Sequence, residues 1–234
     1  MEQRYASTEL THFTGSGQQG SEEKIFETLT QIVKSGRLTG RPDVDPTDKF
    51  YKARLKMGIR NGNWYVCFCD IPVADLALHA AKYSRFGLSF RKEFIIQQGG
   101  TPVFYMATSK PSLLNKISEE LEWLAPESPE FYENATQDDV DDPDYQRRLA
   151  LKWIFRQRFL AYAKPFDPLL GDEQRENYYL EREWRLLGDL QFRLDQVERV
   201  FLPREYAREF HKRVTEYPGQ LTFIGIKGHP TLNG

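Results

Sequence analysis

The chain has 234 residues, of which 40% are hydrophobic, 14% aromatic and 28% charged. This composition supplies enough apolar mass for a packed core and excludes a wholly disordered chain. The formal net charge of −2 gives no general attraction to nucleic acid, so any contact with a polyanion must come from a local patch.

The first half of the chain predicts alternating helices and strands. Apolar residues recur at helical spacing between Ser21 and Gly36, which are typical of an N-cap and a C-cap. Residues 64–69 form a continuous apolar run, which predicts a buried strand. Pro72 then opens a helix that runs to about Tyr83. Further strands are expected at 86–90 and 102–107, with a short helix at 92–98 between them.

The second half begins with a helix at 112–124 and then changes composition. Residues 125–144 contain three prolines and a run of five aspartates, which predicts a solvated loop. A long basic helix follows from about 145 to 163, where Pro165 ends it. We interpret residues 125–175 as an insert. Residues 178–187 are rich in aromatic side chains and alternate in character along the chain, which predicts a strand. The chain finishes as strand, helix and strand over 197–202, 204–217 and 221–226.

This order predicts the fold class α+β, because strands and helices are mixed without a strict βαβ rhythm. The length allows one large domain, and we expect residues 1–234 to form a single domain. No glycine-rich phosphate loop and no set of Cys or His with metal spacing is present, so no metal is expected. Neither a signal peptide at residues 1–5 nor an apolar run of membrane length is found, so we expect a cytoplasmic protein with no membrane contact.

Two segments near strands contain candidate residues for ligand binding. His12 lies in a short segment that reads as a strand, and imidazole can bond a ribose hydroxyl near neutral pH. The alternative is a half-exposed histidine bonded to backbone. In the segment 83–90, the aromatic residues at 86 and 90 and Leu88 are expected in the core. Tyr83 and Ser89 remain as the polar candidates.

A third candidate is the pair Glu181 and Glu183. On a strand these two carboxylates would share one face, where they repel unless a cation or ligand lies between them. Such repulsion raises the pKa of one carboxyl or opposes a positive charge that develops in a substrate. The alternative is a surface strand whose carboxylates pair with neighbouring arginines.

A basic stripe, Arg148, Lys152 and Arg156, falls at i, i+4 and i+8 of the long helix. It could follow the phosphate backbone of a nucleic acid, which would then be a possible partner, or the acceptor of a group that the protein transfers. The run of aspartates just before it favours the alternative, in which these acidic side chains neutralise the basic side chains of the helix. Cys67 and Cys69 share a buried run without a neighbouring histidine and are expected to be structural.

Two segments carry a resemblance to a known family. Residues 67–72 (CFCDIP) and 181–185 (EREWR), with YSRFGLSF at 83–90 between them, occur in an order that resembles the AbiGi-type abortive-infection proteins of bacterial phage defence. The resemblance runs from about residue 10 to 190 and is poor over 125–175. Members have been described as the antitoxin-like part of a two-gene operon, which implies a toxin or antitoxin protein as partner.

The three-part layout is also similar to ADP-ribosyltransferases, which implies an ADP-ribosyltransferase-like mixed sheet with flanking helices and NAD as substrate. Carried over, His12 with Thr14 binds the nicotinamide-side ribose, and Tyr83 stacks on nicotinamide with Ser89 nearby. Glu183, or less favourably Glu181, then stabilises the charge that develops on the ribose. The expected function is an NAD-dependent effector of phage defence. The alternative is a non-catalytic antitoxin or sensor, in which His12 and Glu183 need not face one cleft.

Overall fold

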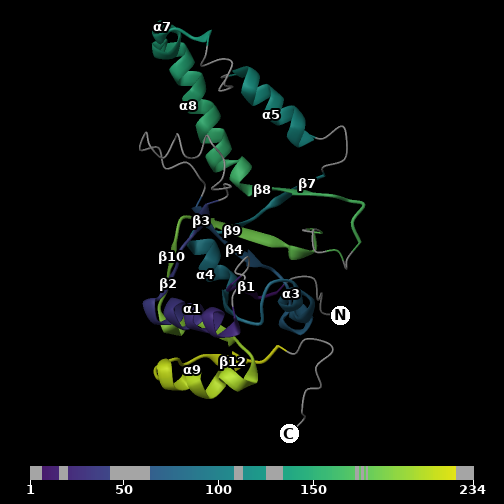
Figure 1. Cartoon of the computed structure of the whole chain (residues 1–234), viewed down its shortest axis with the longest axis vertical. Coiled ribbons are helices and arrows are strands. Elements are labelled where there is room, and N and C mark those ends of the chain that lie inside the picture. Colours follow the sequence, from purple (N-terminus) through teal and green to yellow (C-terminus); the bar gives the residue numbers. More distant parts are fainter. Residues whose placement is uncertain are drawn as a thin grey trace. The chain divides into compact units, whose positions relative to one another are not determined.

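The computed structural model describes residues 7–15, 21–42, 64–107, 113–124, 134–171, 174, 177 and 179–224. Contacts divide the chain into two compact units. The first contains Met1–Lys52, Asn63–Pro102 and Glu181–Gly234, and the second contains Ala53–Gly62 and Val103–Leu180. Most of the helices and strands are labelled in Figure 1. The expected single domain stays a prediction.

The first unit is built on a mixed sheet in which most neighbouring strands are antiparallel. Its order is β12-β11-β5-β1-β4-β9-β6, with β3 beside β4. The strands are β12 (Gln220–Thr222), β11 (Val197–Phe201), β5 (Gly87–Arg91), β1 (Glu9–Phe13), β4 (Trp64–Cys69), β9 (Glu183–Leu187), β6 (Thr101–Pro102) and β3 (Arg41–Pro42). β11 and β12 are parallel and are joined through η5 (Arg204–Tyr206) and α9 (Ala207–Arg213). The predicted α+β class is confirmed at this level.

One cross-strand row fixes which side chains share a face of this sheet. Arg199 lies opposite Ser89, Ser89 opposite Thr11, Thr11 opposite Cys69, and Cys69 opposite Glu183. Residues directly opposite each other on neighbouring strands have side chains on the same face. The row therefore places a line of polar side chains across five strands, on one face.

The other face carries the main apolar core. α1 (Glu22–Ser35) buries Ile25, Phe26, Leu29 and Val33, and Gly36 ends it at φ 61°, as the sequence predicted. α4 (Lys92–Gln97) and α9 add Ile95 and Phe210 to the same core. On the face of the polar row, η1 (Val73–Asp75) and α3 (Leu76–Lys82) supply a smaller cluster that includes Phe13 and Leu76.

The peripheral elements of the first unit are short. β2 (Arg37–Leu38) and β10 (Leu190–Gln191) form a separate antiparallel pair, which Arg37 and Asp189 flank with an ion pair. η4 (Leu194–Gln196) then leads into β11. None of the described helices combines the length and apolar character that crossing a membrane requires.

Within its described residues, the second unit contains a parallel pair of strands and three α-helices. β7 (Phe104–Ala107) pairs with β8 (Ala163–Phe166), and the chain between them forms α5 (Leu113–Leu124), α7 (Gln137–Asp141), α8 (Pro143–Arg158) and η2 (Leu160–Tyr162). α8 begins at an N-cap, Asp142, whose carboxylate accepts hydrogen bonds from the backbone N–H groups of Asp144 and Tyr145 at 3.3 and 3.1 Å.

Three expectations for these regions were wrong. The strand expected at 102–107 is split between β6 and β7, which belong to different sheets. The long helix was expected to run from about 145 to 163 and to be ended by Pro165. Instead, α8 ends at Arg158, and Pro165 lies within β8. Residues 137–141 form α7, with a capping box between Thr136 and Asp139, where a loop was expected. The capping box explains this difference, because it satisfies backbone donors that would otherwise disfavour a short helix.

Candidate functional site

The strand expected at 178–187 begins five residues later than the sequence suggested. Tyr179–Glu181 forms η3, and Arg182 has a φ of 46°, in the left-handed region that non-glycine residues rarely adopt. β9 starts at Glu183. The prediction that Glu181 lies on this strand was wrong, because the turn at Arg182 interrupts the alternation that the sequence pattern assumes.

Both carboxylates are nevertheless buried, at 6% exposed for Glu181 and 4% for Glu183. Glu183 Oε1 accepts a hydrogen bond from Arg185 Nε at 2.6 Å, in an ion pair whose two side chains are 4–5% exposed. The Arg185 guanidinium also lies 4.2 Å from the centroid of the Tyr65 ring. A buried ion pair of this kind holds Glu183 in one place.

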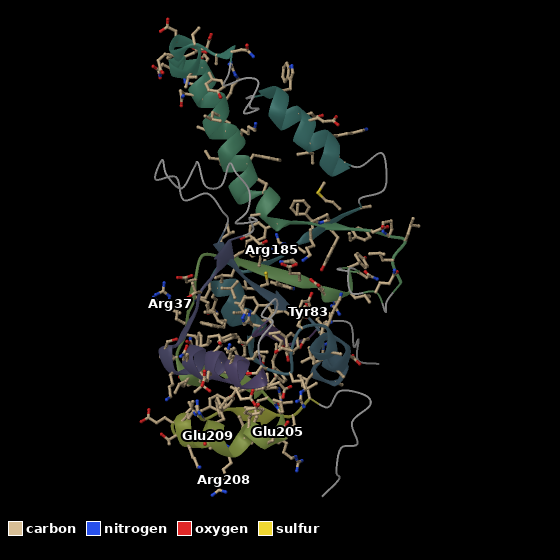
Figure 2. All side chains as sticks on the ribbon, viewed as in Figure 1. Arg37, Tyr83, Arg185, Glu205, Arg208 and Glu209 are labelled. Carbon is tan, nitrogen blue, oxygen red and sulfur yellow. The ribbon has the colours of Figure 1, made fainter. Side chains whose placement is uncertain are left out.

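Glu181 contacts residues that end α3. The Tyr83 hydroxyl donates to Glu181 Oε1, and Lys82 Nζ lies 3.9 Å from the same oxygen. Burial raises the pKa of Glu181 to about 8, with the charge of Glu183 adding to the rise and Lys82 and Arg185 opposing it. Its carboxyl is therefore mostly protonated at neutral pH. We call Glu181, Glu183, Arg185, Tyr83 and Lys82 the carboxylate cluster; Tyr83 and Arg185 are labelled in Figure 2.

His79 and Phe13 form the apolar side of this cluster. The Phe13 and Tyr83 rings stack at 6.4 Å, and His79 lies 5.6 Å from Tyr83 and 6.3 Å from Phe13 between ring centroids. Burial, with a contribution from Lys82, lowers the pKa of His79 to about 4, so its ring is neutral. His79 Nε2 has no hydrogen-bond partner within the described residues.

His12 lies away from the carboxylate cluster. It neighbours Thr11 along β1, so its side chain is on the face opposite to the row of Thr11, Cys69 and Glu183. Its ring makes an edge contact with Phe68, at 6.0 Å between centroids. Nδ1 donates to the Cys67 carbonyl at 2.8 Å, which is the backbone bond that the alternative interpretation anticipated.

The other two predicted binding residues also lie apart from Glu181 and Glu183. Ser89 is fully buried and donates to Glu9 Oε2 at 2.6 Å, and Glu9 in turn accepts from Arg199 at 3.0 Å. Thr14 follows β1, and its carbonyl accepts from Ser84 at 2.6 Å. Thr14 Oγ1 is buried without a hydrogen-bond partner among the described residues. The structure thus brings together Tyr83, Glu181 and Glu183 from the predicted set, and their roles stay predictions.

Sequence reasoning missed Lys82 and His79 as neighbours of the carboxylates. Both precede Tyr83 on α3, about 100 residues before Glu181, and no local pattern marks their proximity. Helical spacing does place His79 and Tyr83 on one face, so a tyrosine contact could have indicated the histidine. The described residues contain no group of three or more His, Cys, Asp or Glu side chains placed to hold a metal ion.

The basic stripe expected on the long helix does not form one exposed face. Lys152 is only 1% exposed, whereas Arg148 on the preceding turn is exposed. The Arg156 side chain lies outside the described residues. Arg147 pairs with Asp144 at 3.3 Å, in line with self-neutralisation of the acidic and basic runs.

Comparison with known proteins identifies the family. A family model described as "Putative abortive phage resistance protein AbiGi, antitoxin" matches residues 46–217. The chain belongs to the AbiGi family. The matched range includes Tyr83, Ser89, Glu181 and Glu183 but excludes His12 and Thr14.

A curated AbiGi relative shows how far the similarity extends. The "Abortive phage resistance protein AbiGi" of Lactococcus lactis subsp. cremoris is 27% identical over 141 residues, which cover 55% of this chain and 53% of that protein. The match therefore spans about half the length of the relative. No solved structure matches the chain.

Proposed function

We propose that this chain acts in abortive phage resistance as an antitoxin, a protein that binds a toxin and restrains it. The family description names an antitoxin, and the relative is named as a phage resistance protein. The observation that carries the proposal is the buried ion pair between Glu183 and Arg185, at 2.6 Å.

The ion pair favours a binding role over a catalytic one. A catalytic carboxylate stabilises charge on a substrate atom, which it must be able to approach. Glu183 is 4% exposed and its charge is compensated by Arg185 of the same strand. Glu181 is mostly uncharged at neutral pH because its pKa is about 8. His12, predicted to bind the nicotinamide-side ribose, has its side chain on the opposite face of the sheet.

Co-expression tests the antitoxin proposal directly. The neighbouring gene of the two-gene operon, induced alone in a bacterial host, should arrest growth, and co-expression of this chain should restore it. The purified proteins should form a complex in gel filtration. Toxicity of this chain by itself, or no rescue despite normal expression, would contradict the proposal.

A second candidate is an NAD-dependent ADP-ribosyltransferase effector, which one observation favours. Tyr83, which directly follows α3, contacts Glu181, and Glu183 lies close enough to raise the pKa of Glu181, so three of the predicted residues from two distant segments come together. Isothermal titration with NAD distinguishes the two candidates. Heat of binding that Tyr83→Phe weakens supports the enzyme, and no heat at millimolar NAD with the protein folded removes it.

A further inference from the structure

The helices of the second unit expose large apolar side chains. On α8, Leu151 is 60% and Ile154 53% exposed, and Phe159 at its end is 57% exposed. Leu151 and Ile154 are three residues apart and therefore adjacent on the helix surface. Single exposed apolar residues are common, but neighbours on successive turns form a patch of the kind that binding partners cover.

The opposite side of α8 fixes how this helix is rotated. Tyr145 and Lys152 are seven residues apart, which places them on one face, and they are 4% and 1% exposed. α8 therefore has a buried face already occupied within the chain. Leu151 and Ile154 are exposed because they lie on the other face of α8, although the helix packs against the chain through its buried face.

An acidic hollow lies at the start of the same helix. It has a volume of about 530 Å³ and is lined by Asn134, Ala135, Asp138, Asp139, Asp142, Tyr145 and Arg148. Its lining contains three carboxylates and one guanidinium, so the hollow is negative. Asp139 and Asp142 also cap helices, but Asp138 makes no ion pair within the described residues.

The hollow and the apolar residues follow one another along α8. Arg148 lines the hollow, Leu151 is one turn further, and Ile154 follows on the next turn. An acidic pocket beside apolar side chains is complementary to a surface that offers a lysine or arginine next to apolar residues. Two copies of this chain that paired hollow to hollow would bring like charges together, which repulsion disfavours.

We propose that this face of the second unit, the hollow together with Leu151 and Ile154, is the docking surface for the toxin, and that the toxin inserts a basic side chain into the hollow. The inference rests on the proposed antitoxin function and names the surface that performs it. The carboxylate cluster in the first unit then maintains the fold and does not contact the toxin.

A matched pair of substitutions tests the apolar part. Ile154→Asp places a charge in the proposed interface, and Ile96→Asp does the same on α4 of the first unit, where the side chain is similarly exposed at 51%. Toxin affinity is measured by calorimetry on full-length proteins whose circular dichroism matches the parent. Ile154→Asp should weaken binding by at least about tenfold, as expected for a buried anchor, and Ile96→Asp should leave it unchanged.

A second pair tests the charge. Asp138→Lys should weaken binding about tenfold, whereas Glu27→Lys on the exposed face of α1 should not. Raised salt should weaken binding by the parent and have less effect on Asp138→Lys.

The outcomes separate this surface from the antitoxin proposal. If the parent binds the toxin and both Ile154→Asp and Asp138→Lys bind equally well, the surface is wrong and the function stands. If the parent does not bind the toxin at all, the function itself fails. If Ile154→Asp instead converts a dimer of this chain to a monomer in light scattering, the face joins copies of the chain and the toxin assignment is overturned.

Discussion

Replacing Glu181 by glutamine should remove a loss of stability that the parent protein shows as pH rises toward 8. The Glu181 carboxyl has a folded-state pKa of about 8, against 4.5 for the ordinary group. The folded protein therefore holds this proton where the unfolded chain has released it, so the free energy of unfolding decreases as pH rises toward 8. Glutamine keeps the shape and can still accept the hydrogen bond from Tyr83, but it does not titrate.

The expected magnitude comes from the pH window above 6.5, where the contribution of His79 no longer changes. His79 has the opposite effect, because its pKa is lowered from 6.5 to about 4 and its contribution rises with pH between these values. The two effects oppose each other below pH 6.5. From 6.5 to 8 the Glu181 effect remains, and at about 1.4 kcal/mol for each pH unit the parent should lose about 2 kcal/mol.

Urea unfolding at pH 6.5, 7.0, 7.5 and 8.0, followed by tryptophan fluorescence, measures this loss. The difference between parent and Glu181→Gln is the decisive quantity, because it cancels the other groups that titrate in this window. Glu27→Gln, on the exposed face of α1, serves as the control and should follow the parent. If the parent and Glu181→Gln show the same pH dependence, Glu181 is not protonated by burial and the description of the carboxylate cluster is wrong.

Further substitutions at Glu183, Arg185, Arg182 and Gly87 test the description of the first unit. Glu183→Gln should lower the free energy of unfolding by about 3 kcal/mol, because it leaves the buried Arg185 charge uncompensated, and adding Arg185→Met should recover part of that loss in urea unfolding. Arg182→Gly should change stability by less than about 1 kcal/mol, whereas Arg182→Val should cost about 1–3 kcal/mol, because a β-branched residue is strained at a φ of 46°. Gly87→Ala should destabilise by about 1–3 kcal/mol in thermal unfolding, since its Cβ would lie 2.6 Å from the His12 carbonyl oxygen.

Local patterns in the sequence predicted the elements that depend on local physics. The helix ended by Gly36 and the strands at 64–69 and 86–90 have the caps, apolar periodicity and length that determine them. The same reasoning failed around Pro165, because a proline that ends a helix and a proline at a strand edge look alike in sequence. Pairing of β7 with β8 joins segments more than 50 residues apart, and no local signal announces it.

The candidate site shows a similar division. The sequence identified Glu181 and Glu183 as candidate catalytic residues and Tyr83 as a candidate binding residue, and the structure places the three side chains together. It could not reveal the conformation of Arg182, because a left-handed arginine is imposed by its surroundings and not by its own preference. Nor could strand alternation alone separate His12 from Glu183, since the face that each occupies depends on the pairing of β1, β4 and β9.

The two segments that carry the family resemblance are held together by backbone and charge. The Asp70 N–H donates to the Arg182 carbonyl at 3.1 Å, and Arg182 Nη2 lies 3.9 Å from Asp70 Oδ2. Cys69, next to Asp70, lies opposite Glu183 in the sheet. The CFCDIP and EREWR segments thus form one packed unit in which the turn at Arg182 directs Glu181 toward Tyr83. Substitutions in this packed unit should therefore act through stability, whereas the proposed docking surface predicts that substitutions on α8 act on partner affinity.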